Sequence, residues 1–438
     1  MATGTHLSSA FPLGSRVNER GRLEVGGCDT IELAREFGTP AYVVAEDDLR
    51  ARAQAFVQAG REAGQEDFHV LFASKAFPCT AVLSLFAQEG LWCDVASGGE
   101  LHLALNAGFA PERIVMHGNA KSGAELRMAL AHGVGLIVVD NLDEIERLAS
   151  LVAERGGGEG AGRASEQAVL VRVTPDVRGE THEKISTGQA DSKFGFALAQ
   201  AGEAIARVHD AEGLSLRGLH AHVGSQLLTL EPFERAAAEL AQLGDFPVWD
   251  LGGGLGVRYT ESQPEPPSIE EYVATVVAAA HAHGTGRERR LLIEPGRALC
   301  ANACVTLYEV QSVKQNVSRW VAVDGGMSDN LRPMLYGAPY EAQVADRFPV
   351  PGRCGGTTAC VLAGKHCESG DVIVRHALLD DPRPGDVIVT PATGAYGYAM
   401  ANNYNGVPRA PVVFCREGDA RVVVRRERYE DLTARDVR

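Results

Sequence analysis

The sequence lacks the features that place a protein in a membrane or outside the cell. Its first twenty residues contain no basic stretch followed by an apolar one, and no apolar run is long enough to cross a bilayer. Its nine cysteines are an odd number scattered over 438 residues, which does not make a disulfide framework. We therefore expect a cytoplasmic protein without membrane contact, in which most cysteines are small buried residues.

Signals for metal and nucleic acid are also missing. No pair of C-x-x-C motifs suggests a zinc site, and no metal is expected. The 57 acidic residues outnumber the 42 basic ones, which gives a net charge of −15 and argues against nucleic acid as a partner. A hydrophobic content of 45% is ordinary for a globular protein of two or three domains.

The sequence does contain a regular alternation of strand-like and helix-like stretches after Phe68. About eight β/α units fill roughly 230 residues, which is the size and rhythm of a (β/α)8 TIM barrel. An open doubly wound sheet is the alternative, but it usually carries fewer strands. Strands are predicted at 69–74, 91–95, 114–117, 136–140, 169–174, 215–222, 248–251 and 291–294, and helices at 81–88, 99–106, 123–131, 142–154, 232–243 and 269–282.

Beyond Gly296 the pattern changes to short β-like runs separated by Gly and Pro, which predicts an all-β second domain. Earlier strand-like runs at 23–25 and 41–44 precede the barrel, and we expect them to join this second, β-domain. The predicted fold class is thus α/β plus all-β, with a β-barrel or β-sandwich formed by the N-terminal segment and the C-terminal third. The predicted boundaries are 1–46, 47–300 and 301–438. The Gly-rich run at 156–162 is interpreted as a flexible surface loop.

Lys75 ends an apolar run, F-H-V-L-F-A-S-K-A-F, which begins at Phe68. If the run is buried, desolvation would lower the pKa of Lys75 and free its amine as a nucleophile or Schiff-base partner. The alternative is a lysine that extends from the strand end into solvent.

Nearly every predicted barrel strand ends in a polar residue, and catalytic groups of barrel enzymes gather at these ends. Turn formers would explain some Asp and Gly, but not Lys, His and Glu together. The residues at the strand ends are Lys75, Asp94, His117, Asp140, Arg172, His222, Asp250 and Glu294.

The glycines of D-L-G-G-G-L-G, residues 252–254, follow the seventh strand, where barrels often bind phosphate through backbone N–H groups. They do not have the G-x-G-x-x-G spacing of a dinucleotide site, and a Gly-rich turn is as often structural. Glu294 needs a cation, either nearby Arg297 or the protonated ring nitrogen of a cofactor. His222 could stack on such a ring, Ser225 could bind its phosphate, and His220 could be a packed strand histidine.

A lysine for an imine, a phosphate cradle and a carboxylate for a pyridinium are together what pyridoxal 5'-phosphate (PLP) requires. At this point many motifs, in order from about residue 40 to the C-terminus, resemble the diaminopimelate decarboxylase family of fold-type III PLP enzymes. They are F-A-S-K-A-F, D-V-A-S-G-G-E-L, H-G-N-A-K-S, T-H-E-K-I-S-T-G to D-S-K-F-G, H-V-G-S-Q, D-L-G-G-G-L-G, E-P-G-R, D-G-G-M-S-D-N-L-R-P-x-L-Y-G-A, C-E-S-G-D and G-A-Y-G.

The resemblance implies an alanine-racemase-type barrel with a β-domain, in a homodimer whose active sites lie between subunits. It also implies decarboxylation of meso-2,6-diaminopimelate to L-lysine and CO2, the last step of lysine biosynthesis by that route. Departures from the family pattern are small: Val223 stands where Ile is common, and Ala120 where a second Asn is expected.

Carried over by position, the motifs imply a role for each site residue. Lys75 would bind the PLP aldehyde covalently and His222 would stack on the ring. Ser225, Gly252, Gly253, Gly254 and Tyr396 would hold the phosphate, Glu294 would face the pyridine nitrogen, and Asp94 and Arg172 would support the lysine and the ring. Arg297, Arg332, Tyr336 and Tyr396 would bind substrate, and Cys367 and Glu368 would act catalytically on the partner subunit's substrate.

The choice of substrate rests on two arginines. Arg297 and Arg332 suit the distal carboxylate of diaminopimelate, whereas a distal amine would need an acidic site; their alternative role is in structural salt bridges. Other hypotheses remain open: a PLP decarboxylase of ornithine, lysine, a carboxylated polyamine or a carrier-linked amino acid, a catalytically silent dimeric homologue, or a barrel enzyme of FMN or a sugar phosphate. Glu294 argues against a racemase, which places Arg there.

Overall fold

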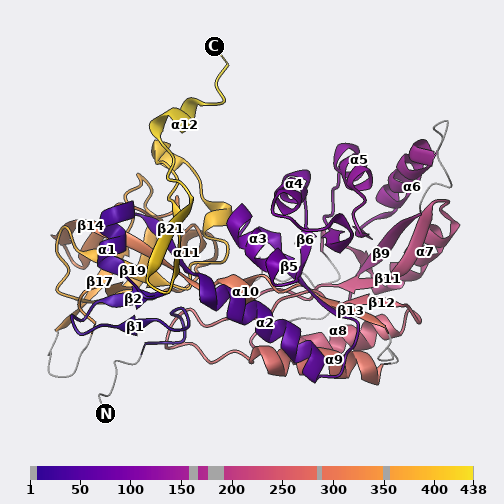
Figure 1. Cartoon of the computed structure of the whole chain (residues 1–438), viewed down its shortest axis with the longest axis horizontal. Coiled ribbons are helices and arrows are strands. Elements are labelled where there is room, and N and C mark those ends of the chain that lie inside the picture. Colours follow the sequence, from indigo (N-terminus) through magenta and orange to yellow (C-terminus); the bar gives the residue numbers. More distant parts are fainter. Residues whose placement is uncertain (1–6, 157–165, 176–191, 284–288, 349–355, 438) are drawn as a thin grey trace. The chain divides into compact units, whose positions relative to one another are not determined.

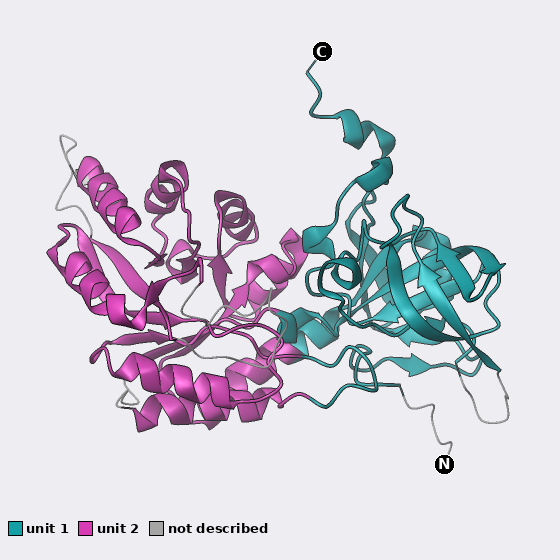
Figure 2. Cartoon of the chain, turned by 180° about the vertical axis from the view of Figure 1, so that it is seen from behind, with its two compact units in different colours: residues 1–51, 257–265, 297–438 teal, residues 52–256, 266–296 magenta. Residues whose placement is uncertain are grey.

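The computed structural model describes residues 7–156, 166–175, 192–283, 289–348 and 356–437. These form two compact units (Figure 2). The barrel unit contains residues 52–256 and 266–296, and the sheet unit contains residues 1–51, 257–265 and 297–438. Most of the predicted Gly-rich loop and the T-H-E-K-I-S-T-G motif lie outside the described residues.

The barrel unit is built on a closed ring of parallel strands. Each strand pairs with its neighbours in the order β5, β6, β7, β8, β9, β11, β12 and β13, and β13 pairs back to β5. The strands are β5 (Phe68–Ala73), β6 (Trp92–Val95), β7 (Ile114–Met116), β8 (Leu136–Val139), β9 (Gln167–Thr174), β11 (Leu214–Ala221), β12 (Val248–Asp250) and β13 (Arg290–Ile293), with the short β10 (Phe196–Ala197) added beside β9. The predicted barrel is confirmed, with strand ends within about two residues of their expected positions.

Helices surround the strands of this ring (Figure 1). They are α2 (Glu46–Glu62), α3 (Thr80–Gln88), α4 (Gly98–Asn106), α5 (Gly123–His132), α6 (Leu142–Gly156), α7 (Leu198–Asp210), α8 (Glu231–Ala241) and α9 (Ile269–Ala282), with the 3-10 turns η1 (Ser74–Ala76) and η2 (Pro111–Arg113). Helix α7 is not among the predicted helices. Its buried residues Ala201, Ala204 and Val208 nevertheless follow helical spacing.

The inside of the ring is a packed core. Large apolar side chains from successive strands meet there, including Leu71, Val115, Leu170 and Leu292, all fully buried. A barrel filled in this way is rigid, so its strand ends hold polar groups in fixed positions.

The sheet unit is organised around the long strand β14 (Cys304–Gln315), which pairs with β4 (Ala41–Ala45), β15 (Arg319–Val323) and β19 (Val387–Pro391). Strand β4 also pairs in parallel with β20 (Val412–Arg416). The remaining strands are β1 (Arg16–Val17), β2 (Leu23–Val25), β3 (Cys28–Asp29), β16 (Gln343–Val344), β17 (Thr357–Ala363), β18 (Val372–Asp380) and β21 (Asp419–Val424).

One hydrophobic core joins the two sequence segments of this unit. Val25 and Val43 from the N-terminal segment pack with Val305, Val389 and residues of β20. The predicted fold class, a barrel plus a domain shared by the N-terminal segment and the C-terminal third, is confirmed. The second domain is mostly sheet rather than all-β, because it also contains the helices α1 (Thr30–Phe37), α10 (Arg297–Cys300), α11 (Arg332–Tyr336) and α12 (Tyr429–Thr433) and the turns η4 (Tyr398–Met400) and η5 (Tyr404–Gly406).

In the part of the chain that the structure describes, no helix combines the length and the apolar character needed to cross a membrane.

Candidate active site

Lys75 lies in the turn η1, directly after β5, with its Nζ 3.3 Å from Oδ2 of Asp94 on β6. The apolar residues before it are buried as predicted, but 47% of the Lys75 side chain is exposed, against 3% for Asp94. Of the two alternatives that the sequence leaves open for Lys75, the structure has the lysine that extends from the strand end, since the 3-10 turn carries it beyond the buried strand. The structure presents an accessible amine held beside a buried carboxylate.

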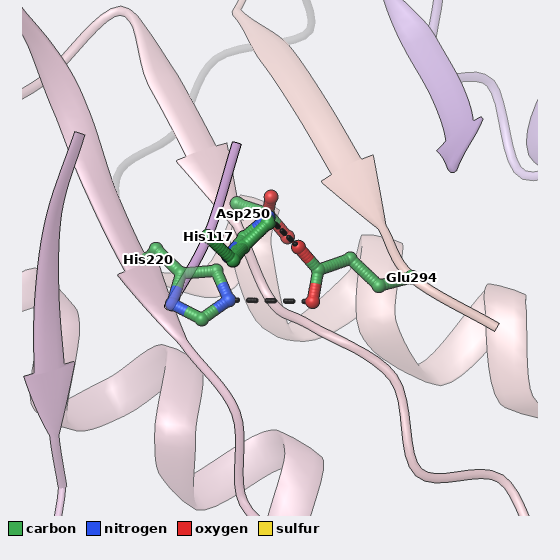
Figure 3. A group of neighbouring side chains, drawn as sticks. All are labelled: His117, His220, Asp250 and Glu294. Carbon is green, nitrogen blue, oxygen red and sulfur yellow. Dashed lines mark hydrogen bonds and ion pairs between the residues drawn. The ribbon is translucent and has the colours of Figure 1, made fainter. Parts of the chain in front are cut away.

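Glu294 is the centre of a buried polar cluster at the strand ends (Figure 3). Its Oε1 lies 2.7 Å from Nε2 of His117, which follows β7, and its Oε2 lies 3.3 Å from Nε2 of His220 on β11. The side chain of Asp250, at the end of β12, converges on the same carboxylate. The partners of Glu294 in this cluster are thus histidines from other barrel strands.

Burial and neighbouring charges shift the pKa values of the residues in this cluster. Burial, followed by the charge of Glu294, raises the pKa of Asp250 well above its usual range. Burial alone would raise the pKa of Glu294, but the nearby imidazoles of His117 and His220 outweigh it and hold that pKa well below the usual range. Burial lowers the pKa of His220 to about 4. The arrangement keeps Glu294 ionised in a place where a lone carboxylate would be costly.

His222 is held in a defined state by the glycine loop. Its Nδ1 accepts a hydrogen bond of 3.0 Å from the N–H of Gly253, which requires an unprotonated nitrogen at that position. Burial, followed by the charge of Lys75, lowers the pKa of His222 well below its usual value. The imidazole is therefore neutral, and 17% of the side chain is exposed.

The loop after β12 requires glycine for steric reasons. Gly252 has φ of +64°, and a Cβ there would lie 2.5 Å from the carbonyl oxygen of Ala221. A Cβ on Gly253 would lie 2.0 Å from the carbonyl oxygen of Glu294. The N–H of Gly252 donates to Oδ1 of Asp250, and that of Gly253 donates to His222, so both are used inside the barrel. Among the described residues, none accepts the N–H of Gly254.

Arg172 lies on β9, with its guanidinium 4.4 Å from the ring centroid of Phe194 and 3.9 Å from Oδ1 of Asp140. Oδ2 of Asp140 accepts from the N–H of Gly195 at 3.0 Å. The described part of the D-S-K-F-G motif therefore packs on Arg172, close to the ends of β8 and β9. Ser225, in the loop after β11, is half-buried.

The sheet unit holds the remaining predicted site residues. Arg297 begins α10 and donates to the hydroxyl of Tyr259, and its guanidinium lies 4.9 Å from the ring centroid of Tyr396. Arg332 begins α11 and donates to the hydroxyl of Tyr340 at 2.5 Å. Both arginines are buried. Tyr396 has φ of +63°, which is uncommon for a residue with a side chain and typical of functional sites.

Tyr336 ends α11 and is half-buried. Cys367 is exposed, and its N–H donates to Oδ1 of Asn405 at 2.9 Å. Glu368 is half-buried and accepts from the N–H of Gly370 at 3.3 Å. The C-E-S-G-D loop thus presents its cysteine to solvent in this chain.

A family model, described as the pyridoxal binding domain of pyridoxal-dependent decarboxylases, matches residues 46–301. The chain is 45% identical to the diaminopimelate decarboxylase of Bacillus subtilis over 97% of both chains. It is 47% identical to that of Actinosynnema pretiosum over 98% of this chain and 95% of the relative. The chain belongs to the diaminopimelate decarboxylase family.

Solved structures agree with this membership. The diaminopimelate decarboxylase of M. jannaschii, in complex with L-lysine, superposes with a TM-score of 0.89 at 31% identity, over 98% of this chain and 99% of that one. A lysine/ornithine decarboxylase from Vibrio vulnificus, at 24% identity and a TM-score of 0.73, shares the fold. The predicted family, the decarboxylase class and the PLP cofactor are confirmed by these matches.

Sequence reasoning missed part of this decarboxylase's polar machinery. His117, His220 and Asp250 were visible as polar residues on or at the ends of strands, but nothing in the sequence joined them to Glu294. The alternation H-A-H was a usable signal, because residues two apart on a strand share a face. Tyr259 and Tyr340, which contact the two arginines, had no sequence signal.

Proposed function

We propose that this protein is a carbon–carbon lyase that decarboxylates meso-2,6-diaminopimelate to L-lysine and CO2, the last step of lysine biosynthesis by that route. Its near full-length similarity to diaminopimelate decarboxylases supports the reaction. The observation that supports the substrate assignment is the state of Arg332. This residue is only 5% exposed, and no carboxylate of the described residues forms an ion pair with its guanidinium.

Arg332 suits an acidic ligand for electrostatic reasons. A buried cation without a counter-ion is unfavourable, and a bidentate carboxylate is its best partner. The far end of diaminopimelate carries such a carboxylate beside its amine, whereas ornithine and lysine carry only an amine there and offer the guanidinium no anion. Arg297 and Tyr336 are proposed to contact the same end of the substrate.

The barrel residues fit PLP. Lys75 offers an accessible amine beside Asp94. The N–H of Gly254 is the member of the glycine triple without an internal acceptor among the described residues, which suits it to a phosphate oxygen. When bound, PLP supplies an electron-accepting ring for the pair of electrons that CO2 leaves behind. Lys75 is proposed to bind the aldehyde.

Glu294 is proposed to face the pyridine nitrogen. The histidines lower the pKa of its carboxyl group, whereas burial raises that of Asp250, so Glu294 is the carboxylate suited to stabilise a protonated ring nitrogen. The neutral imidazole of His222 is suited to stacking on the ring. Ser225, Gly252, Gly253 and Tyr396 are proposed to surround the phosphate, Tyr396 also to contact the substrate, and Arg172 to support the ring. In this proposal Gly252 and Gly253 act by shape, since their N–H groups are already used.

We further propose a cytoplasmic homodimer in which Cys367 and Glu368 act on the substrate of the partner subunit. The exposure of Cys367 supports this, because an exposed cysteine beside an acidic residue can contact another chain. The proposed domain boundaries remain 1–46, 47–300 and 301–438. Sedimentation of the PLP-loaded protein tests the dimer, and loss of turnover in Cys367→Ala without loss of PLP tests the role of the loop.

The decisive experiment measures CO2 release by the PLP-loaded protein from meso-diaminopimelate, L-ornithine and L-lysine in parallel, with Lys75→Ala as the blank. Release from diaminopimelate alone would support the proposal. Release only from ornithine or lysine would keep the cofactor chemistry and overturn the substrate. A protein that binds PLP but releases nothing from any of the three would contradict the proposed activity and favour a carrier-linked substrate or a silent homologue.

A further inference from the structure

Arg297 and Arg332 share one aromatic ring. The guanidinium carbon of Arg332 lies 4.5 Å from the ring centroid of Tyr259, and that of Arg297 lies 5.8 Å from the same centroid. Arg297 also donates a hydrogen bond to the Tyr259 hydroxyl. Tyr259 is 2% exposed, so its ring is fixed by its surroundings as well as by the arginines.

Two more tyrosines extend the arrangement. Tyr396 lies on Arg297 at 4.9 Å, and Tyr340 lies on Arg332 at 5.6 Å, in each case from guanidinium carbon to ring centroid. The rings of Tyr259 and Tyr340 are themselves in edge-to-face contact at 5.3 Å. The order is Tyr396, Arg297, Tyr259, Arg332 and Tyr340, and we call it the arginine–tyrosine stack. All five residues belong to the sheet unit.

An aromatic ring restrains a guanidinium without neutralising it. A carboxylate would also fix an arginine, but it would occupy the donors and cancel the charge that a ligand needs. The face of a ring attracts the cation and leaves the N–H groups at the guanidinium edge available. Long arginine side chains otherwise lose rotamer freedom on binding, so fixing them beforehand improves affinity.

Tyr340, at the end of the stack, likewise contacts Arg332 without neutralising its charge. Its hydroxyl accepts from Nη1 of Arg332 at 2.5 Å. Burial raises the pKa of Tyr340 to about 12, although the charge of Arg332 opposes the rise. Tyr340 therefore stays neutral near pH 7 and leaves the positive charge of Arg332 uncancelled.

We infer that Tyr259 is a positioning residue for substrate specificity: its ring sets the separation and orientation of the Arg297 and Arg332 guanidinium groups, so that together they recognise a distal carboxylate. The inference rests on the proposed function, in which these arginines bind that end of the substrate. It assigns to Tyr259 an effect on ligands with a distal carboxylate, and none on ligands without one.

The test compares two competitive inhibitors of diaminopimelate turnover. α-Aminopimelate keeps the distal carboxylate and lacks the distal amine, whereas cadaverine keeps both amines and has no carboxylate. For Tyr259→Leu, which removes the ring, we expect the Ki of α-aminopimelate and the KM of diaminopimelate to rise roughly ten-fold, the size of a desolvated cation–π contact. The Ki of cadaverine and the PLP affinity, measured by absorbance titration, should stay unchanged.

Two further variants separate positioning from folding. Tyr259→Phe keeps the ring and loses only the hydroxyl, so it should recover most of the affinity that Leu loses. Tyr308→Phe removes the hydroxyl of another buried tyrosine of the sheet unit, one that donates to Asp329 at 2.6 Å. It should lower stability without separating the two inhibitors. If Tyr259→Leu does not fold, Tyr259→Met, which also removes the ring but fills more of its volume, takes its place; a loss shared equally by both inhibitors, or no loss for either, would overturn the inference.

Failure of the inference is distinguishable from failure of the proposed function. If Arg332→Ala weakens both inhibitors equally or neither, the arginines do not recognise the distal carboxylate and the proposed function fails. If Arg332→Ala weakens α-aminopimelate selectively and Tyr259→Leu does not, the proposed function stands and the role of Tyr259 is overturned.

Discussion

The two units hold their polar site residues by opposite means. In the barrel unit, ionisable side chains are paired with one another: Glu294 with His117 and His220, and Lys121 with Glu144 at 2.8 Å, both of these last side chains 1% exposed. In the sheet unit, the buried Arg332 of the proposed substrate site is packed on the rings of Tyr259 and Tyr340. Internal pairing satisfies a charge, whereas ring packing leaves it for a ligand.

This difference matches the two tasks. A cofactor site needs groups of fixed protonation, which neighbouring charges and burial provide. A substrate site needs charge that stays available until the substrate arrives. Changes in the barrel unit should therefore affect cofactor binding, protonation and stability, and changes in the arginine–tyrosine stack should affect substrate affinity and selectivity.

The largest expected effect is that of Lys75→Ala. Removing the amine beside Asp94 should reduce CO2 release to background and abolish the absorption band of lysine-bound PLP, because no other group can replace a covalent amine. Absorbance and CO2 release are measured on the same preparation. Lys314→Ala, an exposed lysine of β14, serves as the control and should keep both. A yellow Lys75→Ala protein would remove Lys75 from this role.

Arg332→Ala tests the other unit. It should lower kcat/KM for diaminopimelate by roughly 10²-fold through KM, as expected when a buried charge contact is truncated, and leave the PLP affinity unchanged. Steady-state kinetics and absorbance titration measure the two quantities. Arg383→Ala, which removes an exposed arginine paired with Asp381, is the matched control and should change neither. An unchanged KM in Arg332→Ala would contradict the assignment.

His220 predicts how stability depends on pH. Its pKa is about 4 in the folded chain, against an ordinary value of 6.5, so the unfolded chain binds more protons between these pH values. Stability should fall as pH is lowered from 6.5 to 4, by roughly 3 kcal/mol from this group. Urea unfolding across this range measures the slope. His220→Asn should reduce it, and His132→Asn, at an exposed position of α5, should not; equal slopes in all three proteins would refute the prediction.

The smallest effects are expected from helix caps. Ser122 accepts from the N–H of Glu125 at the start of α5 in the barrel unit, and Asp29 accepts from the N–H of Ile31 at the start of α1 in the sheet unit. Ser122→Ala and Asp29→Ala should each lower the free energy of unfolding by about 1 kcal/mol. Both should leave KM and PLP affinity unchanged. A shift in KM for either variant would contradict this prediction, because it would show that a change in stability alone alters substrate recognition.

Much of the fold could be predicted because it is encoded locally. The alternation of apolar runs with helical stretches placed each barrel strand, and Lys75, Asp94 and Glu294 fell at strand ends by position alone. The exposure of Lys75 stayed open, because a single 3-10 turn decides whether a residue after a strand is covered. Helix α7 was missed although its buried residues follow helical spacing.

The sequence by itself determined the barrel, the family and the chemical types of the candidate residues, since these follow from periodicity and from motifs within short stretches. Only the tertiary structure decided which side chains lie against Glu294 and which arginines contact the same aromatic ring. His117 and His220 meet Glu294 because the sheet closes on itself, and Tyr259 lies between two arginines from later parts of the chain. Protonation and charge availability depend on burial and on neighbours distant in sequence, and neither is written in a local pattern.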